Sequence, residues 1–200
     1  MRLDHALHRR FVAERRTRVL AGLLAAGLPE GGRVLDVGCG DGHVSRRIAE
    51  LRPDVEVRGL DVFVRPGAVI PIERFDGETI PQPDGSWDAL LFVDVLHHTR
   101  DPMVLLREAR RVTRRCILIK DHNVDDFLAG PLLRFMDRVG NPAEGVPFPD
   151  HYWTRERWHQ AFRELDLRVA SWNERLHLFP PPVDWILGRS LHFVARLERS

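Results

Sequence analysis

The chain has 200 residues, of which 44% are hydrophobic, so it can form one sizeable core but leaves little room for a large additional module. Its formal net charge of +1 gives no electrostatic reason to expect a nucleic-acid partner. No apolar run approaches the roughly 20 residues that span a bilayer, and the charged first residues lack a signal-peptide core. We therefore expect one cytoplasmic domain over residues 1–200, with Cys39 and Cys116 as small apolar residues rather than disulfide partners.

The first predicted element is a helix from Leu3 to Leu28, which carries four apolar residues at helical spacing. These residues are Leu7, Phe11, Val19 and Leu23. We expect residues 1–28 to form an N-terminal helical cap beside the substrate entrance. Basic residues on its other faces could guide an anionic acceptor, but a solvated helix face is the favoured interpretation.

The stretch from Val34 to Gly42 is the most informative part of the chain. A short apolar strand leads there into three alternating glycines and then into a predicted helix over His43–Leu51. Glycine lacks a Cβ, so the chain can turn sharply and bring its N–H groups close to a ligand. The helix, whose expected apolar face holds Val44, Ile48 and Leu51, directs its positive N-terminal end at the same place.

A second apolar run, Val55 to Leu60, ends in Asp61, which lies 21 residues after Gly40. In βαβ folds an acidic residue at this point can accept hydrogen bonds from both hydroxyls of a ribose. Dinucleotides and adenosyl-sulfonium cofactors both fit that design. A dinucleotide site has a third glycine where this chain has His43, and the bulk of that side chain argues against a close pyrophosphate.

The next apolar run, Ala89 to Val93, is typical of a central strand that is covered on both faces. The pair Asp101-Pro102 is typical of a helix start and predicts a helix from Pro102 to Val112. The residues from Cys116 to Lys120 then predict a fifth strand.

The final third of the chain differs in character, because glycine and proline are frequent after the fifth strand. We expect residues 123–153 to be an insertion that covers the active site, with a helical patch over 132–139. Thr154 is expected to cap a further helix that continues to Leu165. The last two strands are expected to be antiparallel and to run from Arg168 to Arg175 and from Leu191 to Leu197.

The series Asp36-x-Gly38-x-Gly40-x-Gly42 resembles motif I of the class I S-adenosylmethionine (SAM) dependent methyltransferases. Residues 75–88 and 95–102 are similar, in the same order, to the downstream block of the small-molecule branch of that family, the methyltransferase type 11-like proteins. The resemblance implies an α/β, Rossmann-like, doubly wound and mostly parallel seven-stranded sheet. It also implies an antiparallel last strand, an N-terminal helix and an insertion after the fifth strand.

The resemblance further implies that SAM is the cofactor and S-adenosylhomocysteine the product. The cofactor-binding residues that it implies are Asp36, Gly38, Cys39, Gly40, Asp61, Val62, Asp76, Gly77, Val93 and Asp94. Of these, Asp36 and the glycines would surround the methionine end, Asp61 would hold the ribose, and Asp76 would accept from the adenine amino group. Taken singly, Asp61 could be only a strand-end cap, and Asp76 with Gly77 only a turn.

The methyl group of SAM is activated by the positive sulfur, so alignment of the reacting atoms is the main task of the protein. An acceptor hydroxyl or acidic carbon also needs a base, for which histidine is suited. Our first candidate is His122, which follows the fifth strand, and His98 and Asp121 are further candidates. Asp121 is adjacent to His122 in the sequence, but adjacent residues on an extended chain point opposite ways and need not pair. A packing role is at least as plausible for His97 and His98.

Lid packing is the favoured role for His151 and Tyr152. No metal is expected, because no pair of these histidines has the spacing of H-E-x-x-H and the chain lacks a Cys-x-x-Cys.

The sequence therefore predicts a SAM-dependent methyltransferase that acts on a small-molecule acceptor, with no nucleic-acid partner and no membrane span. Two alternatives stay open. A non-catalytic SAM sensor or partner subunit would keep the glycine loop and Asp61. A nicotinamide-dependent oxidoreductase would need room for a second nucleotide beyond Gly42.

Overall fold

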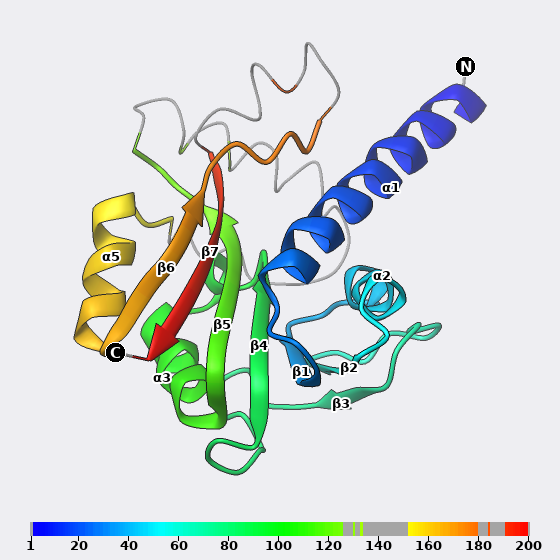
Figure 1. Cartoon of the computed structure of the whole chain (residues 1–200). Helices are drawn as coiled ribbons and strands as arrows, with labels where there is room; N and C mark the ends of the chain where they lie inside the picture. The colour runs from blue at the N-terminus through cyan, green and yellow to red at the C-terminus, as the bar shows by residue number, and fades with distance from the viewer. Residues whose placement is uncertain are drawn as a thin grey trace.

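In the computed structural model, the described residues form a seven-stranded sheet with helices on both faces (Figure 1). The structure describes residues 2–125, 130, 133, 152–179, 184 and 191–199, and within 2–12 it describes the backbone only. The strand order is β3-β2-β1-β4-β5-β7-β6. Strand β7 is antiparallel to both of its neighbours, and the other pairs are parallel. This arrangement confirms the predicted fold class, including the antiparallel last strand.

The elements have the following bounds. The strands are β1 (Gly32–Val37), β2 (Val55–Asp61), β3 (Ile72–Arg74), β4 (Trp87–Val93), β5 (Thr113–His122), β6 (Leu167–Asn173) and β7 (His192–Arg199). The helices are α1 (Arg2–Gly27), α2 (His43–Leu51), α3 (Pro102–Val112) and α5 (Arg155–Glu164), with a 3₁₀ turn η1 (Leu96–His98).

The sheet has its topological switch point at β1, which pairs with β2 on one side and with β4 on the other. Val37 at the end of β1 lies opposite Leu60 of β2 and Phe92 of β4, so these strands end at the same edge. Ligands of open α/β sheets bind at such an edge, outside the carboxyl ends of the strands. The fold thus gathers the residues after β1, β2, β4 and β5 in one place.

Helix boundaries agree closely with the sequence signals. Helices α2 and α3 have the predicted bounds. The Asp101 side chain accepts from Met103 N at 2.9 Å and caps α3, while Thr154 Oγ1 accepts from Arg157 N at 3.2 Å and caps α5. Each cap satisfies an N–H group that has no partner within the helix.

The buried faces of the first two helices differ from the prediction. In α1 the fully buried residues include Leu20 and Leu24, whereas the predicted Leu23 is only partly buried. In α2 the side chain of Leu51 is 45% exposed, because it stands at the last position of the helix, and Ser45 is buried instead. Ser45 is buried because its hydroxyl donates to a buried carboxylate of β1.

Strand β3 was not located by the sequence pattern. It lies at the sheet edge and pairs only with β2. Its three residues are too few to show a period-two pattern. Most of the predicted insertion over 123–153, with its helical patch at 132–139, lies outside the described residues.

The core has two layers, one on each face of the sheet. Helices α3 and α5 cover one face, where Leu106 and Trp158 pack in the same cluster as Phe92. Helices α1 and α2 cover the other through Leu24 and Ile48. The indole Nε1 of Trp158 also donates to the carbonyl oxygen of His122 at 3.1 Å, which ties α5 to the carboxyl end of β5.

None of the described helices combines the length and the apolar character that a membrane span requires. Both cysteines are free thiols, as predicted; Cys116 is buried and Cys39 is partly buried.

Two glycines offer a matched test of packing around the glycine loop. Gly42 and Gly67 have nearly the same left-handed φ, 85° and 86°. A Cβ on Gly42 would lie 2.5 Å from Ile70 Cγ1, whereas a Cβ on Gly67 would meet nothing within 4 Å. We predict that Gly67→Ala lowers the free energy of unfolding by about 1–2 kcal/mol through backbone strain alone. Gly42→Ala should lower the free energy of unfolding by about 1–3 kcal/mol more than Gly67→Ala does, because Ile70 must also move. Equal losses in denaturant unfolding would contradict this reading of the loop.

Candidate functional site

The glycine loop is held against the end of β2 by hydrogen bonds that its backbone N–H groups donate. Gly38 N donates to the Leu60 carbonyl oxygen at 2.7 Å, and Gly40 N donates to Asp61 Oδ2 at 2.8 Å. Gly38 and Gly40 have φ values of 74° and 63°, which a side chain rarely tolerates. The glycine loop and Asp61 are therefore in direct contact, as the sequence predicts.

Asp61 has a structural role in addition to its predicted role at the ribose. Its Oδ1 accepts from Phe63 N at 3.0 Å, and its Oδ2 accepts from the glycine loop. A carboxylate oxygen has two lone pairs, so these bonds leave acceptor capacity for ribose hydroxyls. The strand-end cap and the ribose contact are thus compatible.

Asp36 lies buried beneath the loop, with 2% of its surface exposed. Ser45 Oγ donates to its Oδ2 at 2.6 Å, whereas Oδ1 has no hydrogen-bond partner among the described residues. Burial raises the pKa of Asp36 from 3.8 to about 7, the Ser45 hydrogen bond opposes this rise, and the charge of Asp61 adds to it. A buried carboxylate oxygen without a partner fits the cationic amino-acid end of a cofactor.

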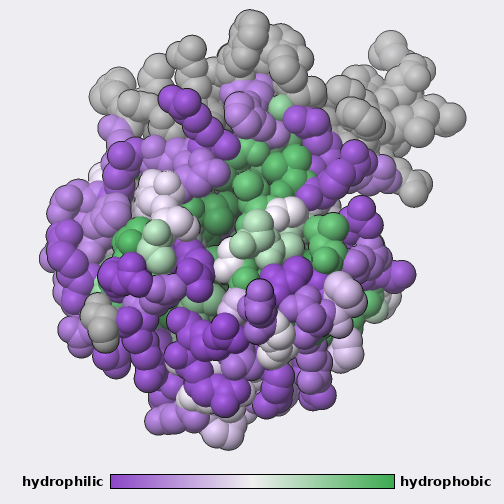
Figure 2. Space-filling model, viewed as in Figure 1, coloured by the Kyte–Doolittle hydropathy of each residue, from purple (hydrophilic) through white to green (hydrophobic). Residues whose placement is uncertain are grey.

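Apolar surface follows directly after Asp61. Val62, Phe63 and Val64 are 48%, 62% and 41% exposed. A Cβ on Gly77 would lie 3.0 Å from Val62 Cγ1, so the two predicted adenine-site residues are neighbours. More widely, Figure 2 shows apolar side chains gathered in a recess near the middle of one face and framed by hydrophilic ones.

Asp76 forms a turn. Its Oδ1 accepts from Thr79 N at 2.7 Å and from Glu78 N at 2.8 Å. These hydrogen bonds stabilise the carboxylate and lower the pKa of Asp76. The turn interpretation thus describes this side chain, while its contact with adenine stays a prediction.

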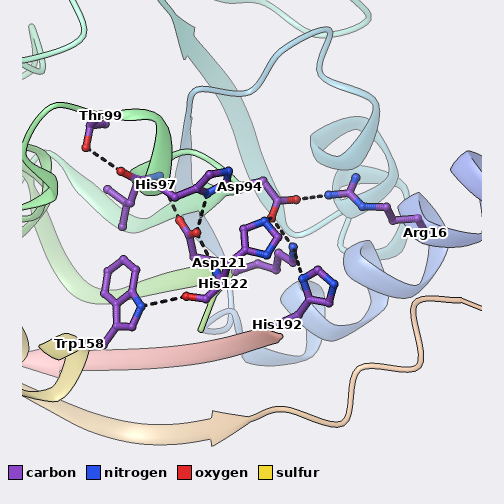
Figure 3. Close-up of polar contacts among 10 residues, drawn as sticks. Arg16, Asp94, His97, Thr99, Asp121, His122, Trp158 and His192 are labelled. Atoms are coloured by element: carbon purple, nitrogen blue, oxygen red, sulfur yellow. Dashed lines mark hydrogen bonds and ion pairs between the residues drawn. The ribbon is translucent and has the colours of Figure 1, made fainter. Parts of the chain in front are cut away.

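A second group of polar residues lies at the carboxyl ends of β4 and β5 (Figure 3). Asp94, directly after β4, has a positive φ of 57°. Its carboxylate accepts from Lys120 Nζ and from Arg16 Nη2 of α1, and His122 Nε2 lies 3.3 Å from its Oδ1. Burial alone would raise the pKa of Asp94, but Lys120 and Arg16 hold it well below its usual range. Asp94 is therefore an ionised residue that joins α1 to β4 and β5.

Asp121 forms a separate pair with His97. Its Oδ1 lies 2.6 Å from His97 Nδ1 and accepts from His122 N at 2.8 Å, while its Oδ2 accepts from Leu96 N at 3.1 Å. The side chains of His97 and Asp121 are 2% and 0% exposed. The carboxylate thus contacts the ring of His97 and only the backbone of the adjacent His122, as expected for neighbours that point opposite ways along a strand.

Burial holds the pKa values of His122 and His192 well below the usual range, and the charge of Lys120 lowers both further. Each ring is therefore neutral and carries one proton. In His122 the proton belongs on Nε2, which faces the ionised Asp94, so Nδ1 is an acceptor. This buried Nδ1 has no hydrogen-bond partner among the described residues. In His192, Nδ1 lies 3.4 Å from the donor Lys120 Nζ, which leaves the proton on Nε2.

The predicted catalytic candidates come together at this edge. The His97 ring lies 3.9 Å from that of His98, 4.5 Å from that of His122 and 5.6 Å from that of Tyr152, between centroids. His151 lies outside the described residues. Ligand atoms of His97, Asp121 and His122 lie within 4.8 Å of one another, so this buried trio could hold a metal ion, although the sequence spacing argues against one.

Sequence reasoning missed three members of the cluster, Arg16, Lys120 and His192. One signal was available for Lys120: it is the single lysine among 30 basic residues, and it ends an apolar strand. No local pattern could have found Arg16 or His192, because they join the cluster only through tertiary packing.

Comparison with known proteins identifies the family. Residues 6–171 match the family model of a methyltransferase domain. The chain belongs to this methyltransferase family. Membership confirms the predicted fold family and its cofactor, SAM.

Two curated relatives are similar to this methyltransferase domain. The 27-O-demethylrifamycin SV methyltransferase of Amycolatopsis mediterranei is 33% identical over 113 residues, which is 50% of this chain and 40% of the relative. The dimethylglycine N-methyltransferase of Parasynechococcus marenigrum is 28% identical over 192 residues, 88% of this chain and 66% of the relative. The chain thus spans less than two thirds of the length of either relative.

Solved structures share the fold at low identity. A chain from the complex of the Haloferax volcanii Trm112 methyltransferase activator with a methyltransferase has a TM-score of 0.71, 17% identity, and coverage of 96% of this chain and 94% of that chain. A SAM-dependent methyltransferase from Mesorhizobium loti has a TM-score of 0.66 and 21% identity, over 89% and 96% of the two chains. The [4+2]-cyclase SpnF has a TM-score of 0.68 and 16% identity, over 91% and 81%.

The raised pKa of Asp36 predicts a pH-dependent stability for this methyltransferase domain. The folded protein binds the proton more tightly than the unfolded chain, so this stabilisation is complete below pH 3.8 and is lost as the pH rises through about 7. Asp36→Asn removes the ionisation. The parent loses this stabilisation as the pH rises, whereas Asp36→Asn does not. The free energy of unfolding of Asp36→Asn minus that of the parent should therefore increase by about 3 kcal/mol between pH 5 and pH 8.

Denaturant unfolding at the two pH values measures this difference, with Glu78→Gln, at an exposed position, as the control. A stability difference between Asp36→Asn and the parent that does not change with pH would contradict the assignment.

Proposed function

We propose that this domain transfers the methyl group of SAM to an oxygen atom of a small-molecule acceptor, and that a histidine removes the proton of the acceptor hydroxyl. The observation that carries this proposal is the buried pair of His97 and Asp121, whose side chains are 2.6 Å apart at the carboxyl ends of β4 and β5. A carboxylate that orients an imidazole and stabilises its protonated form is a recurrent device for proton removal.

The cofactor would be held by the glycine loop and the end of β2. Asp36 and the loop N–H groups fit the amino-acid end, Asp61 fits the ribose, and Val62 offers apolar surface for the adenine. When bound, SAM supplies a methyl group on a positive sulfur, so the protein needs no further activation of the donor. The remaining work falls to residues that position the acceptor and accept its proton.

His97 is a better base than His122 on electrostatic grounds. The Asp121 carboxylate contacts the His97 ring directly and would stabilise a proton on it. His122 contacts an ionised carboxylate too, but Asp94 is already shared with Lys120 and Arg16, and the charge of Lys120 opposes protonation of His122. We therefore assign proton removal to His97, with Asp121 as its positioning residue.

The small-molecule acceptor is supported by the relatives and by the charge of the chain. The similar proteins are named for methyl transfer to a demethylrifamycin, to dimethylglycine and to sterigmatocystin. The formal net charge of +1 offers little attraction for a nucleic acid.

The alternative is that this domain binds SAM without transferring a methyl group. SpnF, a [4+2]-cyclase, shares the fold, and a SAM-binding sensor would also keep the glycine loop. The buried pair of His97 and Asp121 supports methyl transfer over a sensor role. A sensor only binds SAM and needs no residue that accepts a proton near the cofactor site.

The direct test is incubation of the protein with methyl-labelled SAM and a panel of hydroxylated small molecules, with release of S-adenosylhomocysteine as the readout. We expect label to appear on an oxygen atom of at least one acceptor. Binding of SAM without methylation of any acceptor would overturn the proposal in favour of a sensor.

Substitution of His97 tests the assignment of the base. His97→Gln should lower kcat by about 10²–10⁴-fold and leave the affinity for S-adenosylhomocysteine unchanged, because it removes the proton acceptor but not the cofactor site. Raising the pH should partly restore the rate, since the acceptor then ionises without help.

Two variants serve as comparisons for His97→Gln. His98→Gln tests the neighbouring candidate, and His159→Gln on α5, outside the cluster, is the control for folding. A larger loss in His98→Gln or in His122→Gln than in His97→Gln would move the base to that residue.

A further inference from the structure

We propose that His122 determines acceptor specificity by binding a second hydroxyl group of the acceptor, so that the acceptor is a vicinal diol rather than a simple alcohol or phenol. This inference rests on the proposed methyl transfer to oxygen and names the class of acceptor for that reaction.

The first observation is the unpaired nitrogen of His122. Its side chain is 7% exposed, and its buried Nδ1 has no hydrogen-bond partner among the described residues. Leaving a buried polar atom unpaired is destabilising, so such atoms are uncommon in folded proteins. A bound acceptor that donates to Nδ1 would recover this energy, whereas an acceptor without a suitable donor would not.

The second observation fixes which kind of group can bind. The opposite nitrogen, Nε2, lies 3.3 Å from Asp94 Oδ1, and Asp94 is held from two other sides by Lys120 and Arg16. An ionised carboxylate can only accept, so the proton of the neutral imidazole stays on Nε2. Nδ1 therefore requires a donor on the acceptor molecule, and a hydroxyl group supplies one.

The third observation is the spacing of the two histidines. The rings of His97 and His122 meet edge to face, with centroids 4.5 Å apart, and a nitrogen of each lies within 4.8 Å of the other and of an Asp121 oxygen. Asp121 engages His97 Nδ1, so the other nitrogen, Nε2, would face the acceptor. Rings only 4.5 Å apart allow two hydroxyl oxygens on adjacent carbons each to lie at a hydrogen-bond distance of about 2.8 Å from one ring. His97 would then take the proton of the hydroxyl that is methylated, and His122 would bind its neighbour.

A divalent metal ion is the main competing occupant, because His97, Asp121 and His122 are suitable ligands. The trio offers a cation only one carboxylate, Asp121, and the Lys120 ammonium group, whose charge acts on His122, would repel a cation bound there. The charges around the cluster therefore favour a neutral diol over a cation.

The test compares two diols with their monohydroxy analogues, catechol with phenol and cis-1,2-cyclohexanediol with cyclohexanol. Methyl transfer from SAM gives kcat/KM, and calorimetry on the complex with S-adenosylhomocysteine gives affinity even for compounds that react slowly. Two variants form a matched pair. His122→Asn keeps a polar atom near the position of Nδ1, whereas His122→Gln keeps one near the position of Nε2 and removes the acceptor at Nδ1.

We expect the parent protein to prefer at least one diol over its analogue by about tenfold or more, because the analogue leaves Nδ1 unpaired. His122→Asn should keep part of this preference, and His122→Gln should lose it while still binding S-adenosylhomocysteine. Equal affinity for diol and analogue in the parent, or a preference that survives in His122→Gln, would overturn the proposal. So would activity or diol binding that is abolished by EDTA and restored by Mg²⁺, Mn²⁺ or Zn²⁺, which would assign the trio to a metal.

Failure of the proposed function looks different from failure of this inference. If the domain does not methylate, no compound releases S-adenosylhomocysteine, yet the calorimetric preference for a diol and its loss in His122→Gln would persist. If His122 does not bind a second hydroxyl, methylation occurs without that preference.

Discussion

A buried ion pair between Lys120 and Asp94 organises the edge of the sheet where β4 and β5 end. Lys120 is the only lysine in the chain and is 1% exposed, and a buried ammonium group without a partner would be strongly destabilising. Asp94 supplies that partner from the end of the neighbouring strand and also accepts from Arg16 of α1. One carboxylate thus connects the N-terminal helix to the two central strands, and it does so from a strained backbone conformation with φ at 57°.

At the same edge, two histidines contact two different carboxylates. Asp121 points to the other side of β5 from Lys120 and pairs with His97. His122 faces Asp94 and Lys120 and stays neutral. Because alternate residues of β5 point to opposite faces, the short sequence Lys120-Asp121-His122 serves two different carboxylate–histidine pairs. The chemistry we propose follows from that alternation, with proton removal at His97 and acceptor binding at His122.

The features of the fold that depend on local signals were predictable. Helices α2 and α3, the glycine loop and the proximity of Asp61 to Gly40 follow from turn chemistry, capping and strand-end spacing. Burial within α1 was less predictable, since Leu20 and Leu23 both belong to an apolar stripe and tertiary packing selects between them. Strand β3 is too short to leave a pattern, and its position depends on pairing with β2.

The candidate site, like the fold, was predictable only where local sequence signals specify it. The histidines after β4 and β5 could be named from their positions at strand ends, but their partners could not. Alternation along an extended strand indicated that Asp121 and His122 need not pair, but it could not show that the carboxylate contacts His97 instead. Arg16 and His192 come from elements about 80 and 70 residues away from the partners they contact, a separation at which a single sequence carries no pairing signal.

Binding of S-adenosylhomocysteine to the full chain, measured by calorimetry alongside NAD, tests the central claim most directly, because every assignment at this edge presupposes that cofactor. The account predicts saturable binding of one S-adenosylhomocysteine per chain and no binding of NAD. Binding of NAD without S-adenosylhomocysteine, or no binding of either by the folded protein, would contradict it.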